Sequence, residues 1–163
     1  MEIKRVTVIG MGTMGSQIGI VCARGGYETA MVEVSSQLAE KGFKNIESFL
    51  KNQMKKGKMD PETHDRILSR IVTTTHLNEA VGASDLVIEA VFEDIEVKKA
   101  LFKEMGTILK PDGRLFIVEP SFRVSKTEFE ETIGKARAAG FKSVLRPKVF
   151  LSKAVILERG DFT

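Results

Sequence analysis

Short apolar runs alternate with longer amphipathic stretches along the whole chain. Val6–Ile9 and Ile71–Thr74 are runs rich in β-branched residues, whereas the segment 36–57 spaces Phe43, Ile46 and Leu50 three to four positions apart. A short apolar run favours a buried strand, and the wider spacing favours an amphipathic helix. The pattern therefore predicts strands and helices in alternation.

Seven strands are predicted in this way, and they cover residues 6–9, 29–34, 71–74, 85–91, 114–118, 143–149 and 154–157. Helices are predicted after the first strand and over residues 36–57, 61–68, 77–81, 94–109 and 125–139. Two of the helix starts carry capping signals. Asp60 precedes Pro61 as a candidate N-cap, and Ser125 with Glu128 has the form of a capping box.

The order of these elements predicts the fold class. Five strands alternate with helices, which is typical of a mostly parallel sheet with helices on both faces. Residues 151–153 are too few for a parallel crossover, so the last two strands are expected to form an antiparallel hairpin. Pro147 falls in the sixth strand and indicates a sheet edge. We therefore expect residues 1–163 to form a single α/β domain, a doubly wound, Rossmann-like sheet of about seven strands.

The first strand runs into three glycines at the spacing G-x-G-x-x-G. In V-I-G-M-G-T-M-G, Gly10 suits a tight turn, Gly12 lets the backbone approach a phosphate, and Gly15 allows the next helix to pack closely. The N-terminus of that helix then faces the anion. Glu33 follows at the distance where a carboxylate accepts hydrogen bonds from an adenosine ribose and repels a 2′-phosphate. The spacing therefore predicts a dinucleotide site that takes NAD rather than NADP.

Composition and charge exclude several other classes. Hydrophobic residues make up 42% and charged residues 29% of the chain, as in ordinary globular proteins. The net charge of +3 is spread along the chain, so neither nucleic acid nor a membrane surface is an expected partner. Cys22 is the single cysteine, which excludes an internal disulfide and a cysteine-cluster metal site. The sequence has no pattern of a signal peptide or of a membrane span, so a cytoplasmic localisation is expected.

Residues 1–109 closely resemble the NAD-binding domain of the 3-hydroxyacyl-CoA dehydrogenases. The phosphate loop includes the family's Thr13-Met14 pair, and D-L-V-I-E-A-V-F-E-D-I-E-V-K over residues 85–98 is similar to its fourth-strand signature. In that family an acid and a lysine near the nicotinamide ribose match Glu93 and Lys98, and Glu33 stands where aspartate is usual. The implied cofactor-binding residues are Gly10, Gly12, Thr13, Met14, Gly15, Glu33, Ala90, Val91, Glu93 and Lys98. Ser48 and Lys55 match positions that contact coenzyme A, which implies weak acyl-CoA binding.

Residues 110–163 resemble a different family. The segment L-K-P-D-G-R-L-F-I-V-E-P over residues 109–120 is similar to the fifth strand of class I S-adenosylmethionine-dependent methyltransferases. The A-x-x-A-G-F-K pattern at 136–142 and the closing hairpin resemble the same group, and this implies a seventh strand inserted beside the fifth. We interpret the chain as a chimera, engineered or a natural fusion, whose halves meet near residues 109–113.

The resemblances imply that the catalytic machinery is incomplete. Dehydrogenase chemistry in the first family needs a histidine that moves the hydroxyl proton. His64 and His76 both precede the fourth strand and are interpreted as a surface helix residue and a loop residue. Residues 119–121, Glu-Pro-Ser, occupy the loop where the family carries Ser-Asn-Thr-Ser. We expect no counterpart of the family's helical substrate domain, which supplies its dimer contacts. We therefore expect no catalytic residue, no metal site and a monomer.

Four hypotheses for the function follow from these resemblances. The leading one is an NAD(H)-binding domain without complete catalytic machinery. The second is residual NAD-dependent 3-hydroxyacyl-CoA dehydrogenase activity. The third is a chimera in which Pro120 and Phe122 obstruct the nicotinamide pocket. The fourth is binding of S-adenosylmethionine, against which the loop argues because Val8 and Ile9 stand where methyltransferases carry an acid.

Overall fold

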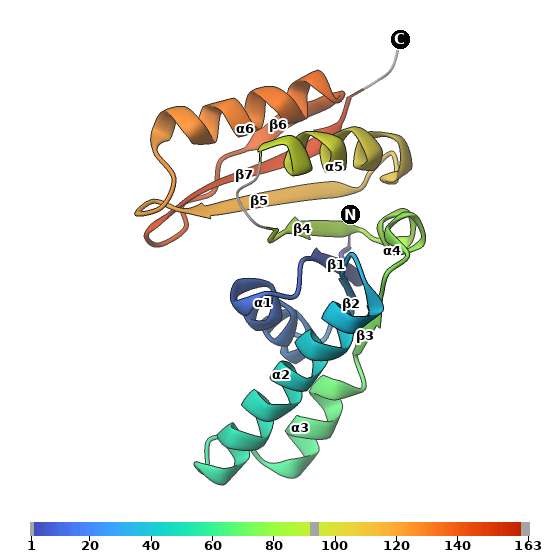
Figure 1. The fold of residues 1–163 in the computed structure, drawn as a ribbon, viewed down its shortest axis with the longest axis vertical. Coiled ribbons are helices and arrows are strands. Elements are labelled where there is room, and N and C mark those ends of the chain that lie inside the picture. Colours follow the sequence, from blue (N-terminus) through green and yellow to red (C-terminus); the bar gives the residue numbers. More distant parts are fainter. Residues whose placement is uncertain (1, 92–94, 161–163) are drawn as a thin grey trace.

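The computed structural model describes residues 2–91 and 95–160. The strands in these residues are β1 (Arg5–Ile9), β2 (Glu28–Val32), β3 (Ile71–Thr74), β4 (Leu86–Glu89), β5 (Arg114–Pro120), β6 (Phe141–Leu145) and β7 (Ser152–Arg159). They form one sheet in the order β3-β2-β1-β4-β5-β7-β6 (Figure 1). The first five are parallel, whereas β7 runs antiparallel to both of its neighbours.

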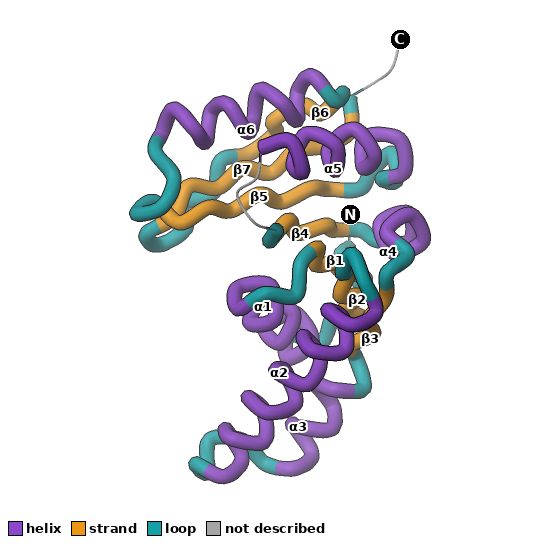
Figure 2. Tube along the Cα trace, in the orientation of Figure 1, coloured by secondary structure: helices purple, strands orange, loops and turns teal. Residues whose placement is uncertain are grey.

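Helices cover both faces of the sheet (Figure 2). The helices are α1 (Thr13–Arg24), α2 (Ser36–Lys55), α3 (Pro61–Leu68), α4 (Leu77–Ala83), α5 (Ile95–Ile108) and α6 (Lys126–Ala138). α1, α2 and α3 enclose one hydrophobic core with β1 to β4, and α4, α5 and α6 enclose the other with β4 to β7. This arrangement confirms the predicted α/β fold with a mostly parallel, doubly wound sheet.

Neighbouring residues of one strand point to opposite cores because side chains alternate along a strand. In β4, Val87 faces the core of α4 to α6, and Ile88 faces the core of α1 to α3. In β5, Leu115, Ile117 and Glu119 are the buried positions. The buried face of β5 therefore ends in a carboxylate at the carboxyl edge of the sheet.

The predicted helix starts are confirmed at both capping signals. The Asp60 carboxylate accepts a hydrogen bond from the Thr63 backbone N–H at 2.7 Å, with Pro61 in the first turn. The Ser125 hydroxyl and the Glu128 carboxylate form the reciprocal capping box of α6. These helices begin where local side-chain acceptors satisfy their first N–H groups.

The last two strands were predicted with wrong boundaries. β6 begins at Phe141, directly after Gly140 (φ 92°) ends α6, and it stops at Leu145, so Pro147 lies beyond the strand. β6 nevertheless forms the edge of the sheet, as the proline indicated. β7 is longer than predicted and runs over Ser152–Arg159, because it pairs with β5 on one side and with β6 on the other.

Three further strand ends differ from the prediction at positions that matter for function. β4 ends at Glu89, so Ala90 and Val91 lie past the strand. β2 ends at Val32, so Glu33 lies just past the strand rather than in it. β5 extends to Pro120, and Glu119 is therefore a strand residue rather than a loop residue. The extension follows from the pairing with β7, whose Ser152 is the partner of Pro120.

Candidate functional site

Two of the three glycines in the loop after β1 are required by the fold itself. Gly10 has φ 96°, a left-handed conformation that L side chains rarely adopt, and a Cβ there would lie 2.7 Å from the Ala90 carbonyl oxygen. A Cβ on Gly15 would overlap the Gly10 carbonyl oxygen. The Ser16 hydroxyl fixes the same turn by donating to the Met11 carbonyl oxygen at 3.0 Å. The turn from β1 into α1 is therefore tightly packed against the residue after β4 and against its own backbone.

Gly12 differs from the other two glycines because nothing in the fold requires it. Its φ is −65°, and a Cβ placed there would meet no atom within 4 Å. Gly12 is the N-cap of α1, and Thr13 and Met14 in the first turn are exposed. The first N–H groups of α1 lack partners within the helix and face the space beside Gly12. The loop thus presents backbone donors and an open approach at one place.

Glu33 lies against this loop. One oxygen of its carboxylate accepts a hydrogen bond from the Met11 backbone N–H at 2.7 Å, and the other accepts one from the Val34 N–H at 3.1 Å. β1 and β2 are neighbouring parallel strands, so the loop after β1 and the residue after β2 meet at the carboxyl edge. The structure therefore places Glu33 beside the glycine loop, and its binding of a ribose remains a prediction.

Ala90 and Val91 follow β4 at the same edge. The Ala90 N–H donates to the Ile9 carbonyl oxygen at 2.9 Å, which brings the residues after β4 beside the start of the glycine loop. The Val91 N–H donates to a Glu89 carboxylate oxygen, also at 2.9 Å. Glu93, the acid predicted at the nicotinamide ribose, lies outside the described residues.

Lys98 lies in a buried ion cluster with Glu89 and Glu119. Its ammonium contacts a carboxylate oxygen of Glu119 and lies 3.5 Å from a carboxylate oxygen of Glu89. The three residues are between 2% and 4% exposed. Glu89 ends β4, Glu119 lies near the end of β5, and Lys98 is the fourth residue of α5. The second Glu119 oxygen is buried and has no hydrogen-bond partner.

Burial and charge act in opposite directions in this cluster. Burial raises the pKa of the Glu89 carboxyl, and the nearby Lys98 ammonium only partly offsets that rise. Burial by itself would lower the pKa of Lys98, but the attraction of Glu89 and the hydrogen bond to Glu119 outweigh it, so the Lys98 pKa is raised. Lys98 is therefore a firmly held cation, and Glu89 is the carboxyl that takes a proton more readily than usual.

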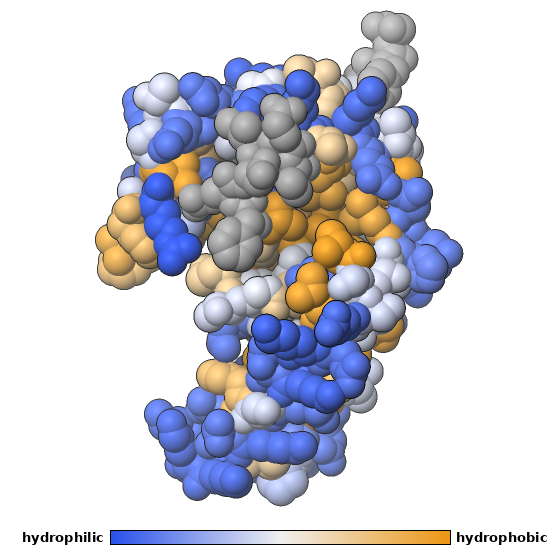
Figure 3. Space-filling view, viewed as in Figure 1, coloured by the Kyte–Doolittle hydropathy of each residue, from blue (hydrophilic) through white to orange (hydrophobic). Residues whose placement is uncertain are grey.

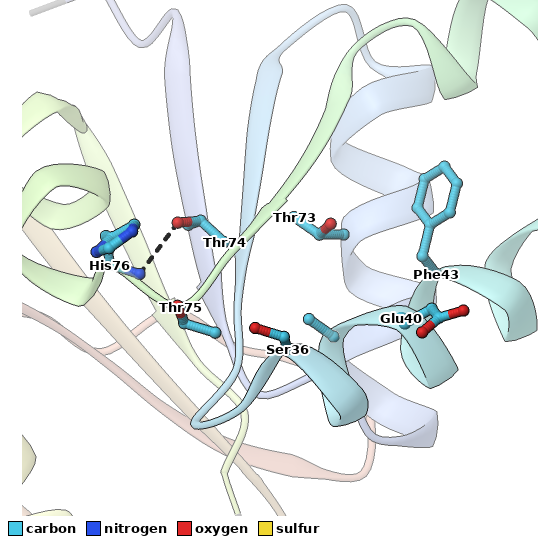
Figure 4. A pocket seen from close by; sticks show the side chains of 8 residues that line it. Ser36, Glu40, Phe43, Thr73, Thr74, Thr75 and His76 are labelled. Atoms are coloured by element: carbon cyan, nitrogen blue, oxygen red, sulfur yellow. Dashed lines mark hydrogen bonds between the residues drawn. The ribbon is translucent and has the colours of Figure 1, made fainter.

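A separate hollow of about 400 Å³ lies at the carboxyl end of β3. It is lined by Ser36, Ala39, Glu40, Phe43, Thr73, Thr74, Thr75 and His76 (Figure 4). Thr74 connects it to the site, because its carbonyl oxygen accepts from the Glu33 N–H at 3.1 Å. The lining comes from β3, its following loop and α2, so the hollow lies on the far side of β2 from the glycine loop.

The residues predicted to contact coenzyme A lie apart from the glycine loop. Ser48 and Lys55 are both exposed, and they stand two turns apart on α2. The surface over α2 and α3 is mostly hydrophilic in the view of Figure 3. The structure therefore places both side chains on a solvated helix, and their role in binding remains a prediction.

His64 was wrongly interpreted as a surface residue. It is 8% exposed, its Nδ1 lies 2.8 Å from an Asp65 carboxylate oxygen, and its Nε2 is buried without a hydrogen-bond partner. α3 is short and packs against both α1 and α2, so its inner face is enclosed although the helix lies at the periphery. His76 is exposed and precedes α4, as the sequence indicated.

Two other features bear on the predicted site. Phe122, proposed above as an obstruction, is 77% exposed in the connection between β5 and α6. Within residues 2–91 and 95–160, no group of three or more histidine, cysteine, aspartate or glutamate side chains is placed to hold a metal ion. The helices of the same residues include none with the length and apolar character needed to cross a membrane.

Sequence reasoning missed two members of the buried ion cluster. Glu89 belongs to the fourth-strand signature but is not among the predicted site residues, and Glu119 is predicted to lie in a loop. The alternation along β5 held a usable signal, because Glu119 continues the buried positions Leu115 and Ile117. A carboxylate at such a position needs a cation nearby, and the sequence could not identify which lysine supplies it.

Comparison with known protein families identifies a strong match. The family model for the NAD-binding domain of 3-hydroxyacyl-CoA dehydrogenase matches residues 5–136. The 3-hydroxyadipyl-CoA dehydrogenase of Escherichia coli is 36% identical over 114 residues, which make up 70% of this chain and 24% of that protein. The chain thus spans about a quarter of the length of this relative.

Comparison with solved structures agrees over the same part of the chain. FadB2 of Mycobacterium tuberculosis aligns with a TM-score of 0.68 and 38% identity, covering 71% of this chain and 40% of that one. A ribosomal protein L11 methylase of Lactobacillus delbrueckii aligns over 98% of this chain and 72% of its own, with a TM-score of 0.64 and 15% identity. The second likeness concerns the fold alone.

Proposed function

Because the chain belongs to the family of NAD-binding domains of 3-hydroxyacyl-CoA dehydrogenases, we propose that it holds NAD(H) at the glycine loop without complete catalytic machinery. NAD is the cofactor that this family indicates. In the proposed site the loop residues Gly10, Gly12, Thr13, Met14 and Gly15 surround the diphosphate. Glu33 binds the adenosine ribose, and Ala90, Val91, Glu93 and Lys98 border the nicotinamide half.

The observation that carries this proposal is the contrast between Gly12 and its neighbours. Gly10 and Gly15 are explained by backbone conformation and packing, but Gly12 has an ordinary φ and open space where a Cβ would stand. Within the protein alone, a larger residue is tolerated there. A ligand that approaches the backbone at Gly12 would be obstructed by a Cβ, which explains why glycine stands at this position. A diphosphate bound at a helix N-terminus is such a ligand.

The test is a titration of NADH fluorescence with the unmutated protein and with Gly12→Val. Saturable binding to the unmutated protein that is lost in Gly12→Val supports the proposal. Gly134→Val is the matched control, because Gly134 also has no atom within 4 Å of a Cβ but lies on α6. The control is expected to bind NADH like the unmutated protein. The absence of saturable binding at any accessible NADH concentration contradicts the proposal.

We further propose that residues 1–109 and 110–163 derive from two different sources joined in a single domain. Support comes from the extent of the sequence similarity, because the relatives at 36–38% identity align with about 70% of this chain. β4 and β5 pair in parallel across the proposed junction. One cooperative unfolding transition by circular dichroism and by calorimetry is therefore expected, and two separate transitions would contradict a single domain.

Residual dehydrogenase activity is the alternative function, and the names of the relatives favour acyl-CoA substrates for it. Neither histidine lies at the glycine loop, since His64 lies on the inner face of α3 and His76 precedes α4. We therefore expect no oxidation of NADH when acetoacetyl-CoA is added. Turnover that follows the amount of protein would establish the alternative instead. Calorimetry with S-adenosylmethionine, for which we expect no heat of binding, tests the remaining hypothesis.

A further inference from the structure

Among the residues that the structure describes, the charges of the buried ion cluster do not balance. Glu89 and Glu119 supply two carboxylates, and Lys98 supplies one ammonium. Glu89 has a further partner, because its other oxygen accepts from the Val91 N–H. The second oxygen of Glu119 has none and is buried. Glu119 is therefore the carboxylate that depends most on Lys98 for compensation of its charge.

The neighbouring strand offers a second cation, but that cation is engaged elsewhere. Lys153 on β7 is the pairing partner of Glu119 on β5. Its ammonium donates instead to the Val124 carbonyl oxygen at 2.6 Å. A buried carboxylate without a cationic partner is strongly unfavourable. Glu119 consequently holds the Lys98 ammonium in place.

Lys98 lies at the same edge of the sheet as the glycine loop. It is the fourth residue of α5, the helix that follows β4 at the carboxyl edge of the sheet, and the glycine loop opens at this edge. A lysine side chain is long and flexible and carries three donors. Here the side chain is 6% exposed, and its ammonium contacts the carboxylates of Glu89 and Glu119.

We propose that Glu119 withholds the Lys98 ammonium from a dinucleotide at the glycine loop and thereby sets the affinity of the site. This inference rests on the proposed function. Glu119 acts through Lys98 and is a positioning residue. Replacing its charge leaves Lys98 with Glu89 alone, one cation with one carboxylate, and frees the ammonium to turn toward the ligand.

The experiment compares the unmutated protein with Glu119→Gln, Lys98→Met and the double variant by NADH titration. Glu119→Gln is expected to lower the Kd for NADH about tenfold, the effect of one added hydrogen bond from a charged donor. Lys98→Met is the reference for the double variant, and the two are expected to have the same Kd because Glu119 acts only through Lys98. In the double variant the gain is expected to disappear. The matched control is Glu158→Gln, which removes a carboxylate paired with Arg114 at the opposite end of β5.

Two outcomes of the titration overturn the inference. An unchanged Kd in Glu119→Gln shows that Glu119 does not limit binding. A gain that persists in the double variant shows that Glu119 acts by repelling the diphosphate and not through Lys98. If the unmutated protein and every variant lack saturable binding, the proposed function fails together with the inference.

A second measurement does not depend on the folding of Lys98→Met. Reductive methylation followed by peptide mass spectrometry reports how accessible the Lys98 amine is. Slow modification is expected in the unmutated protein, at least fivefold faster modification in Glu119→Gln, and protection by NADH in that variant. Equal rates in the two proteins, or no protection by NADH in Glu119→Gln, overturn the inference.

Discussion

The Glu33 carboxylate accepts a hydrogen bond from the Met11 backbone N–H at 2.7 Å. This contact ties the end of β2 to the middle of the glycine loop. Met11 is the residue between Gly10 and Gly12, and its side chain is buried among α1 to α3. The carboxylate proposed to bind the ribose therefore also fixes the loop proposed to bind the diphosphate.

Replacement of Glu33 should separate these two roles. Glu33→Gln keeps an acceptor for the Met11 N–H and removes the charge, whereas Glu33→Ala removes both. We expect NADH binding to weaken at least tenfold in Glu33→Ala and clearly less in Glu33→Gln, because hydrogen bonds to charged groups contribute about 1.5–3 kcal/mol. NADH titration checks this, with Glu28→Gln at the other end of β2 as a control that should not change the Kd. Equal weakening in both Glu33 variants would contradict the loop-fixing role.

The charge of Glu33 should also select between the two nicotinamide cofactors. A carboxylate at the ribose hydroxyls repels the 2′-phosphate of NADPH. We expect NADH to bind more tightly than NADPH, and the ratio of the two Kd values to fall toward one in Glu33→Gln. Competition titrations at one ionic strength measure the ratio. A variant that keeps the full preference for NADH would place the discrimination elsewhere.

The glycines of the loop should differ sharply in their effect on stability. Gly15→Ala forces a Cβ into the Gly10 carbonyl oxygen, and a clash of this kind costs about 1–3 kcal/mol or more. Gly12→Ala places a Cβ in open space at φ −65°, so its free energy of unfolding should stay within about 0.5 kcal/mol of the unmutated value. Urea unfolding followed by circular dichroism distinguishes them. Comparable losses at the two positions would mean that Gly12 is structural.

The change in the free energy of unfolding should depend on which residue of the buried ion cluster is replaced. Lys98→Met leaves Glu119 buried without its cation, and breaking a buried pair in this way costs about 3–5 kcal/mol. Glu119→Gln removes the unbalanced charge and should leave the free energy of unfolding unchanged or raised. Urea unfolding at neutral pH measures both, with Lys103→Met, at an exposed position of the same helix, as the control. A Lys98→Met protein as stable as the unmutated one would contradict the role of Lys98 in compensating the buried charge of Glu119.

Glu89 should make the loss of stability in Lys98→Met dependent on pH. A carboxyl with a raised pKa binds its proton more tightly in the folded state than in the unfolded state. Its contribution to the free energy of unfolding is therefore most favourable at low pH and is lost as pH rises through the folded pKa. The pKa of Glu89 is raised by burial, and removal of Lys98 takes away the attraction that offsets this rise. We expect the deficit of Lys98→Met to shrink as pH is lowered from 7 toward 4.5. A deficit independent of pH in this window would show that Glu89 does not titrate there.

Asp85 should contribute stability with the opposite dependence on pH. The Lys110 ammonium, at 2.9 Å, and the backbone N–H groups of Arg5 and Lys4 lower the pKa of its carboxyl to about 2. A lowered pKa gives stability that is present above about pH 4 and is lost as pH falls through about 2. Asp85→Asn should cost roughly 1–2 kcal/mol at pH 7, and the difference should close toward pH 2. Asp112→Asn, in an exposed turn, serves as the control in the same unfolding series.

The order of the elements and the glycine motif could be predicted because both depend on local chemistry. The β-branched runs, the caps at Asp60 and Ser125, and the spacing from Gly10 to Glu33 are properties of short segments. Parallel neighbouring strands then bring their carboxyl ends together, which places Glu33 against the loop. The ends of β6 and β7 were less predictable, because pairing on both sides lengthened β7 beyond its own apolar run.

The sequence by itself determined the fold class, the glycine loop and the family to which its first two thirds belong. Only the tertiary structure decided that Gly12 is free of protein neighbours, that His64 is enclosed, and that Lys98 is held by Glu89 and Glu119. These features depend on contacts between residues distant in the chain. Burial then determines whether a side chain faces water, a ligand or another charge, and no local pattern carries that information.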